Sequence, residues 1–204
     1  MGHIIAVAGP IGSGKSTLVG GIARALGDAS ILYYDSYEHA TRRTPAEMIQ
    51  WMRAGADFND FDLTGLARDL SKLKSGVSVV NPVTGETVSG ERFIIFEMPL
   101  GRTHRQTAPF IDLLLWIDIP FDIALARKVR EYAKRLLAEG DGTSGLTWLT
   151  GYVDNYTTLI RPLMRIQEER VRPGADLVID GLEEPHAMTR RAAEAIGARF
   201  GHNT

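Results

Sequence analysis

Short apolar runs alternate along the chain with longer segments in which apolar and polar positions follow a helical period. Five of these runs are nearly continuous in apolar residues, as is typical of parallel strands that are covered on both faces. The runs are Ile4–Ala8, Ile31–Tyr34, Phe93–Phe96, Leu113–Ile117 and Leu177–Ile179. Strands that alternate with helices predict βαβ units. The pattern therefore predicts an α/β fold with a doubly wound, mostly parallel five-stranded sheet and helices on both of its faces.

The amphipathic segments between these runs carry recognisable helix ends. Thr44 stands just before a proline and is followed by Glu47, which is the pattern of a capping box at a helix start. A leucine-lined helix is expected to end at Gly76, and a long helical segment from Leu146 to Arg170 is expected to kink or split at Pro162. Further helical faces run from Leu18 to Leu26, from Leu125 to Leu136 and from Met188 to Ile196.

Two segments depart from this alternation. The short segments Val77–Val80 and Thr87–Val88 flank a turn-rich stretch, which predicts a small β-hairpin arm over about residues 77–91. A strongly basic helix is followed by the glycine-rich stretch Gly140–Gly145, which predicts a flexible linker. The basic helix and this linker together predict a helical lid over about residues 127–146. The length of 204 residues suits a single domain spanning 1–204.

The first apolar run leads directly into Gly9-Pro10-Ile11-Gly12-Ser13-Gly14-Lys15-Ser16, the complete pattern of a phosphate-binding loop. Its glycines let backbone N–H groups turn toward phosphate oxygens, Lys15 reaches the β- and γ-phosphates, and the Ser16 hydroxyl holds Mg²⁺. A glycine-rich turn without a ligand is the alternative, but the strand before the loop and the helix after it favour a nucleotide site. The residues expected to bind the nucleotide are Gly9, Gly12, Ser13, Gly14, Lys15, Ser16 and Thr17.

Two acids stand where predicted strands end. Asp35 follows the second run, and groups at the carboxyl ends of parallel strands face the ligand crevice of such a sheet. A carboxylate there can accept the proton of an acceptor hydroxyl, so Asp35 is expected to be a catalytic base, with a turn or helix cap as the alternative. Glu97 ends the third run like a Walker-B acid and is expected to hold Mg²⁺ with Ser16, unless it is only the polar end of a strand.

Basic residues are concentrated in the helix after the fourth run. Such a helix is usually a solvated face, but a lid that closes over phosphates would use arginine to stabilise charge on the γ-phosphoryl oxygens. Arg127 is therefore expected to be catalytic and Arg130 to contact the substrate. Arg102 and Arg105, beyond the third run, are expected either to reach the acceptor or to be surface loop residues.

The composition narrows the class of protein further. A net charge of −2 and a pI of about 6.2 argue against general binding to nucleic acid or to acidic membranes. The absence of cysteine excludes disulfides, thiolate metal sites and cysteine nucleophiles. No apolar run approaches the roughly 20 residues of a membrane span, and no signal pattern precedes the first run, so the expected location is cytoplasmic.

In the order of its motifs the chain resembles the uridine kinase and phosphoribulokinase family of P-loop kinases. The matching segments are Gly9–Thr17, Tyr34–Tyr37, Asp60–Asp62, Ile94–Glu97, Leu125–Val129, Tyr156–Pro162 and Ala175–Ile179. The resemblance implies a P-loop NTPase fold, with Asp35 as the catalytic aspartate and Tyr37 beside it at the substrate. It also implies that Glu97 is the Walker-B acid and that Arg127 belongs to an arginine lid.

The chain departs from this family where the acceptor would bind. Uridine kinases carry an aromatic residue and a histidine in the hairpin arm, and the arm here, Asn81–Glu91, has neither. The helix after Thr44, with Trp51 and Met52, and the loop through Asp57 and Asn59 offer another wall for the acceptor. We therefore expect uridine and cytidine to be poor acceptors, and a polar or anionic metabolite with a primary hydroxyl to be preferred. An anionic subsite beside this wall would be built from Arg42, Arg43, Arg102 and Arg105.

The sequence thus predicts a kinase that uses ATP and Mg²⁺ to phosphorylate a hydroxyl of a small metabolite. A GTPase-like switch would need a guanine-reading Asn-Lys-x-Asp segment, which the sequence lacks. A nucleotide-binding regulator without kinase activity is the other alternative, against which the intact Lys15, Asp35 and Glu97 argue. The expected partner is the small hydroxylated acceptor, with no nucleic acid and no membrane. Assembly into a homo-oligomer is compatible with the sequence.

Overall fold

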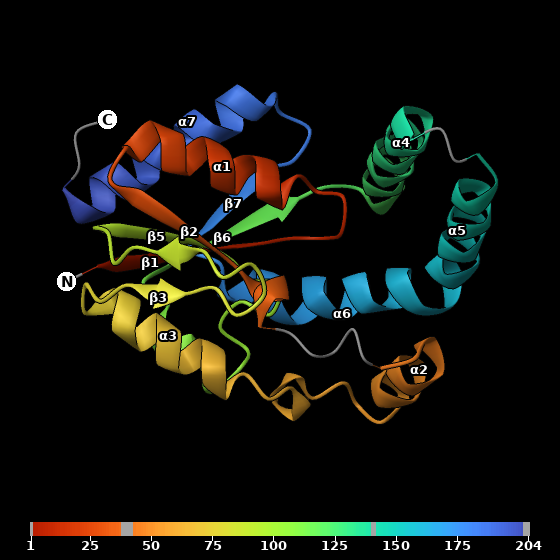
Figure 1. Ribbon diagram of the computed structural model, residues 1–204, viewed down its shortest axis with the longest axis horizontal. Helices are drawn as coiled ribbons and strands as arrows, with labels where there is room; N and C mark the ends of the chain where they lie inside the picture. Colours follow the sequence, from red (N-terminus) through yellow and green to blue (C-terminus); the bar gives the residue numbers. More distant parts are fainter. Residues whose placement is uncertain (1, 38–42, 140–141, 202–204) are drawn as a thin grey trace.

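A five-stranded parallel sheet lies at the centre of the protein, with the strand order β2-β5-β1-β6-β7 (Figure 1). The computed structural model describes residues 2–37, 43–139 and 142–201. The strands of this sheet are β1 (His3–Ala8), β2 (Ala29–Tyr33), β5 (Phe93–Glu97), β6 (Leu113–Asp118) and β7 (Leu177–Asp180). Each of the predicted strands is confirmed, and so is the α/β fold class.

Strand β1 occupies the middle of the sheet and pairs with β5 on one side and β6 on the other. Its residues 4–8 are fully buried, which explains why the run is apolar without alternation. Neighbouring residues point to opposite faces, so that Ile4 and Ala6 belong to one core cluster and Ile5 and Val7 to the other. Because all pairs in the sheet are parallel, the carboxyl ends of its strands meet at one edge.

Helices cover both faces of the sheet, as the alternating pattern predicts (Figure 1). Helices α1 and α7 lie together on one face, and α3 with the end of α6 on the other. In α3, Leu66, Leu70 and Leu73 are fully buried at helical spacing. No described helix has the length and apolar character that a membrane span requires. The bounds of these helices are Lys15–Leu26 for α1, Thr64–Lys74 for α3, Arg161–Val171 for α6 and Pro185–Phe200 for α7.

The predicted hairpin arm is confirmed. Strands β3 (Val79–Val80) and β4 (Thr87–Val88) pair antiparallel. Asn81 orders the turn between them, because its side-chain oxygen accepts hydrogen bonds from the backbone N–H groups of Val83 and Thr84. The Asn81 amide also donates to Ser36 Oγ at 3.0 Å, which holds the arm against the segment after β2.

Helix α2 (Pro45–Arg53) begins at the predicted capping box. The Glu47 backbone N–H donates to Thr44 Oγ1, and the Thr44 backbone N–H donates to Glu47 Oε2 at 2.6 Å. After the helix, Ala56 has a φ of +50°, alone among the non-glycine residues that the structure describes. Its backbone N–H donates to the carbonyl oxygen of Trp51, so the chain folds back on α2 before it enters a 3₁₀ turn at Phe58–Asp60.

Helices α4 (Phe121–Glu139) and α5 (Gly142–Asn155) stand away from the sheet, in the region predicted as a lid (Figure 1). The predicted flexible linker is wrong for residues 142–145, which form the start of α5, while residues 140 and 141 lie outside the described part of the chain. A Cβ atom at Gly145 would lie 2.5 Å from Leu136 Cδ2. The glycine therefore permits close packing of α5 against α4.

The long helical segment before β7 is split, as predicted, but just before the proline. A π-helical turn at Tyr156–Ile160 joins α5 to α6, and Pro162 lies in the first turn of α6. A proline within a helix removes one hydrogen bond and its ring clashes with the preceding turn. The wider π-helical turn accommodates both effects without breaking the helical path.

Candidate functional site

The phosphate-binding loop predicted from the sequence follows β1 at the carboxyl edge of the sheet and leads into α1. Gly12 and Gly14 have φ values of +83° and +94°, which residues with a Cβ atom rarely adopt. A Cβ atom at Gly12 would collide with the carbonyl oxygen of Ala124 in α4, and one at Gly9 would lie 2.9 Å from Ser13 Oγ. The glycines leave a cradle of backbone at the positive end of α1, which suits the phosphates of a nucleotide.

Lys15 lies folded over this loop. Its Nζ donates to the carbonyl oxygens of Gly9 and Pro10, both at 3.0 Å. Burial lowers the pKa of Lys15, while the nearby carboxylates of Glu97 and Asp35 oppose that shift. The ammonium group therefore stands in a poorly hydrated place beside two acids, where phosphate oxygens would replace the loop carbonyls as its partners.

Ser16 and Glu97 are distant in sequence but meet in the structure, one at the start of α1 and the other at the end of β5. The Ser16 hydroxyl donates to Glu97 Oε2 at 2.9 Å. A hydroxyl and a carboxylate are hard oxygen ligands of the kind that Mg²⁺ uses together with phosphate oxygens. The structure thus brings together the two residues that the sequence predicts as the metal site.

One buried polar group in the loop lacks a partner. Ser13 is 1% exposed, and its Oγ forms no hydrogen bond with any residue that the structure describes. An unsatisfied buried hydroxyl costs on the order of 1–3 kcal/mol, which a hydrogen bond to a ligand oxygen would offset. The orphan hydroxyl, the glycine cradle and the pair of Ser16 and Glu97 together fit a nucleoside triphosphate with Mg²⁺.

A cavity of about 800 Å³ opens at this edge of the sheet. Lys15, Ser16, Glu97 and Asp35 all line it, so the predicted acids and the predicted phosphate ligands share one site. Asp35 belongs to a 3₁₀ turn (Tyr34–Ser36) directly after β2 and is exposed. Its carboxylate therefore faces the same space as the phosphate cradle, as the position after a strand predicts.

Tyr37, which the sequence predicts as a substrate contact, does not line this cavity. The residue is buried, and its hydroxyl donates to Asp69 Oδ2 on α3 at 3.1 Å. Burial and the neighbouring Asp69 carboxylate raise the pKa of the Tyr37 hydroxyl. Tyr37 thus anchors the turn that carries Asp35 to α3 and acts on the site only by fixing that turn.

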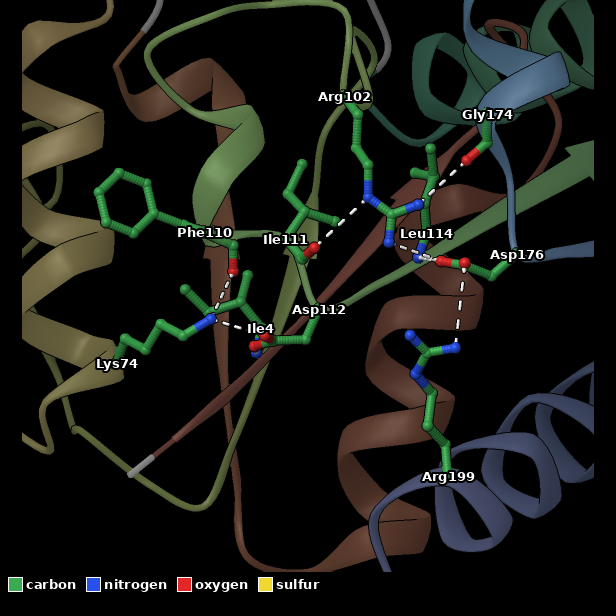
Figure 2. Close-up of polar contacts among 10 residues, drawn as sticks. All are labelled: Ile4, Lys74, Arg102, Phe110, Ile111, Asp112, Leu114, Gly174, Asp176 and Arg199. Carbon is green, nitrogen blue, oxygen red and sulfur yellow. Dashed lines mark hydrogen bonds and ion pairs between the residues drawn. The ribbon is translucent and has the colours of Figure 1, made fainter.

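Arg102 is the second predicted substrate residue that lies elsewhere. Figure 2 shows its guanidinium group bound to Asp176 Oδ2 at 2.6 Å, to the Gly174 carbonyl at 3.0 Å and to the Ile111 carbonyl at 3.4 Å. Asp176 also accepts a hydrogen bond from the backbone N–H of Leu114. Because Leu114 and Asp176 lie at the amino ends of β6 and β7, Arg102 binds at the edge of the sheet opposite the cavity.

Helix α4 brings three basic residues to the cavity, Arg127, Lys128 and Arg130. Lys128 pairs with Glu131 at 3.1 Å and lies 4.9 Å from the centre of the Tyr132 ring. Arg127 and Arg130 are exposed and form no ion pair with a described residue. Both predicted arginines thus lie at the site, and Lys128, which sequence analysis did not single out, joins them.

Another side of the cavity is apolar and aromatic, and we call it the α2–α6 wall. The Trp51 ring lies 5.1 Å from the Phe61 ring and 5.9 Å from the Phe58 ring, measured between ring centres. Helix α2 provides a wall as predicted for Trp51, whereas Met52, Asp57 and Asn59 do not line the cavity. A spacing of three residues along the helix could have identified Met48 as the neighbour of Trp51. The residues of the α2–α6 wall are Met48, Trp51, Phe58, Phe61, Leu163 and Gln167.

The anionic subsite predicted beside this wall is wrong for the arginines that the structure describes. Arg43, Arg102 and Arg105 do not line the cavity, and Arg42 lies outside the described residues. The Arg43 guanidinium group instead lies 5.0 Å from the centre of the Phe61 ring. Residues of the hairpin arm do not line the cavity either. The side of the cavity on which an acceptor would bind is therefore formed by the α2–α6 wall.

Comparison with known proteins supports the fold. No family model matches the chain. The chain is similar to a candidate fructose transport system kinase from Silicibacter sp. TM1040, with 21% identity, a TM-score of 0.56 and coverage of 87% of this chain and 89% of that one. It is also similar to a candidate uridine kinase from Bacillus stearothermophilus, with 16% identity, a TM-score of 0.54 and coverage of 88% and 90%. A shikimate kinase from Acinetobacter baumannii in complex with shikimate has 17% identity, a TM-score of 0.52 and coverage of 98% and 96%. The chain shares the α/β fold of these P-loop kinases.

Proposed function

We propose that this protein is a kinase that uses ATP and Mg²⁺ to phosphorylate a hydroxyl group of a small metabolite, in the manner of uridine kinase-like enzymes. The observation that carries the proposal is the convergence of Lys15, Ser16, Glu97 and Asp35 on one cavity. A phosphate cradle, a pair of metal ligands and a carboxylate that faces the same space are what phosphoryl transfer to an alcohol requires.

Each group has a distinct role in the proposed reaction. The loop amides and Lys15 bind the phosphates. Ser16 and Glu97 would hold Mg²⁺, which would supply positive charge to the phosphate groups. Asp35 orients the acceptor hydroxyl and accepts its proton as the new O–P bond forms and ADP leaves. Arg127 on α4 stabilises the charge that spreads over the transferred group.

The similar structures support this class of reaction at the level of the fold. They are a candidate fructose transport system kinase, a candidate uridine kinase and a shikimate kinase. A shared fold alone does not establish an activity, because one fold supports many reactions. The residues around the cavity supply the chemical reason for assigning the same class of reaction here.

Release of ADP measures the proposed activity directly. The protein with MgATP is expected to release ADP faster when a panel of nucleosides, pantothenate, sugars and simple alcohols includes an accepted compound. Lys15→Met is the matched inactive variant, because it keeps most of the side chain and removes the charge. A wild-type protein that binds MgATP but releases ADP no faster than Lys15→Met with every acceptor would instead be the nucleotide-binding regulator.

A further inference from the structure

The α2–α6 wall contains one polar side chain, Gln167, among apolar and aromatic ones. Every charged residue that lines the cavity comes from other elements: the phosphate-binding loop with α1, the turn after β2, the end of β5, α4, or the segment before α7. The wall itself is therefore uncharged, and the Gln167 carboxamide is its one polar side chain.

The Gln167 carboxamide has no partner in the protein. The residue is 7% exposed, and its side chain forms no hydrogen bond with any residue in the described part of the chain. Its polar atoms still reach the cavity. Among the described residues, the side-chain atoms that are both inaccessible and without a hydrogen bond are Ser13 Oγ and Asp28 Oδ1. A carboxamide that is largely buried, has no protein partner and reaches the cavity with its polar atoms is positioned to pair with a polar group of a ligand there.

The surroundings of Gln167 hold the wall in one arrangement. Arg170, three residues further along α6, donates to the carbonyl oxygens of Ala56 at 2.6 Å and Gly55 at 2.8 Å. Its guanidinium group also lies 5.8 Å from the centre of the Phe58 ring. Ala56 is the residue with the left-handed backbone conformation, which persists only where several contacts fix it. The loop that carries Phe58 is thus fixed against α6 beside Gln167.

The chemistry of this wall defines the group that it can receive. A carboxamide offers one hydrogen-bond acceptor and two N–H donors, which match a carbonyl, amide or hydroxyl group. An anionic group beside the wall would lose its hydration without a cation from the wall in return. We propose that Gln167 selects the acceptor, and that the acceptor is a neutral alcohol with an apolar body and a carbonyl or amide group that pairs with the Gln167 carboxamide. This inference rests on the proposed function.

Three alcohols that differ in one group test this selection. They are 4-(hydroxymethyl)benzamide, which is neutral and polar, 4-(hydroxymethyl)benzoate, which is anionic, and 4-methylbenzyl alcohol, which lacks the polar group. With MgATP, kcat/KM for the benzamide should exceed that for the benzoate by about 10²-fold, because a site that pairs polar groups rejects a mismatched one strongly. It should exceed that for the methyl compound by about 10-fold, the value of one neutral hydrogen bond.

Two matched variants separate selection from structure. Gln167→Met should raise KM for the benzamide by about 10-fold and leave that for the methyl compound unchanged, and it should not lower Tm, because the amide has no protein hydrogen bond to lose. The control Gln50→Met alters an exposed residue of α2 and should change none of these values. A Gln167→Met protein that has a lower Tm and the same benzamide KM as the control would show that Gln167 is structural.

Binding of a fluorescent ATP analogue distinguishes failure of this inference from failure of the proposed function. If the analogue binds with Mg²⁺ but none of the three alcohols binds or reacts, or if the benzoate is preferred, the acceptor class is wrong and the kinase assignment stands. If the analogue does not bind, or binds equally to Lys15→Met, the proposed function fails and the selection of an acceptor by Gln167 fails with it.

Discussion

The two edges of the sheet use the same kinds of charged side chain for opposite purposes. At the amino edge, Lys74 binds Asp112 and Arg102 binds Asp176, both at 2.6 Å, and each carboxylate also accepts a backbone N–H at the start of a strand (Figure 2). At the carboxyl edge, Lys15 has two backbone carbonyls as its hydrogen-bond partners, and the charged groups face a cavity. Charges that are fully paired hold strand ends together, whereas charges directed into a cavity are available to a ligand.

The cavity at the carboxyl edge also holds polar groups without protein partners. Ser13 Oγ and the Gln167 carboxamide have no hydrogen-bond partner among the described residues and belong to residues that line the cavity, whereas the other sealed atom without a partner, Asp28 Oδ1, precedes β2 and lies away from it. A protein that needed these groups only for stability would gain by pairing them or by replacing them with apolar groups. The difference between the edges predicts that substitutions at one edge change activity and those at the other change stability.

The largest effect is expected at the carboxyl edge, from Lys15→Met. Loss of the ammonium group removes the main side-chain charge from the phosphates, so the rate of ADP release should fall by about 10³-fold or more. The free energy of unfolding should not fall, because burial lowers the pKa of Lys15 and so disfavours its charged form in the folded state. Steady-state kinetics and chemical denaturation at pH 7 measure the two quantities. A lower free energy of unfolding together with the loss of activity would show that Lys15 stabilises the fold, like the paired charges of the amino edge.

The next effect separates the two acids of the carboxyl edge. Asp35→Asn should reduce transfer by about 10²-fold while affinity for MgATP stays within a few-fold, since the variant loses a general base and keeps the phosphate site. Glu97→Gln should instead raise the concentration of Mg²⁺ required for half-maximal activity, since it weakens a metal ligand. Titration of Mg²⁺ at saturating ATP distinguishes the two variants. An exchange of the two phenotypes would mean that the roles of Asp35 and Glu97 are assigned in reverse.

At the amino edge, Arg102→Ala should lower stability and leave activity unchanged. The variant leaves Asp176 with its Leu114 hydrogen bond but without its close cation, and the partial exposure of the pair keeps the cost to about 1–2 kcal/mol. Urea denaturation gives the free energy of unfolding, and kcat/KM of the folded protein should match wild type. A selective loss of kcat/KM would restore Arg102 to the substrate site.

The same pair should make stability depend on pH. Burial alone would raise the pKa of Asp176, but hydrogen bonds from Arg102 and Leu114 outweigh it and hold the pKa below its ordinary value of 3.8. A carboxyl group with a depressed pKa stabilises the fold fully above its unfolded value and loses that contribution as pH falls through its folded value. The difference in unfolding free energy between wild type and Asp176→Asn should therefore be constant well above pH 3.8 and shrink below it. A difference that does not change with pH would contradict this account.

The smallest effect is expected from Tyr37→Phe. Tyr37 lies near the carboxyl edge, but its hydroxyl is paired within the protein, as the charged groups of the amino edge are. The variant loses one hydrogen bond to Asp69, which keeps Arg68 as a partner at 3.1 Å, so unfolding should become easier by about 1 kcal/mol. Tyr33→Phe, at an exposed position of β2, is the control and should change neither stability nor kcat/KM. A fall in kcat/KM for Tyr37→Phe that exceeds its loss of stability would return Tyr37 to the substrate site.

Much of the fold and the centre of the site could be predicted from the sequence, because their signals are local. Burial on both faces makes each strand continuous in apolar residues, as at positions 4–8 of β1. The phosphate-binding loop, Asp35 and Glu97 each follow a strand directly, and the end of a parallel strand determines the edge at which a residue lies. Strand prediction therefore also placed these groups together.

The remaining site residues could not be predicted, because their roles depend on distant partners. Arg102 looks like a cation near the end of β5, but its carboxylate partner lies 74 residues further along the chain. Gln167 stands among charged residues of a predicted amphipathic helix, and any polar side chain at this position would fit that helical pattern. Its position in the wall of the cavity depends on how α6 packs in the fold, and no local signal reports that packing.

The central position of β1 also affects the order in which the protein can form during synthesis. Ile4 pairs with Ile94 of β5, and Ala6 pairs with Leu114 of β6, so β1 gains its first neighbour only when nearly half of the chain has left the ribosome and its second only after the midpoint. The phosphate-binding loop continues from β1, and Gly12 meets Ala124 of α4, which is made later still. Pairings this distant in sequence slow folding, and domains of this size fold largely as units. Affinity for nucleotide is thus expected to arise late and in a single step on the nascent chain.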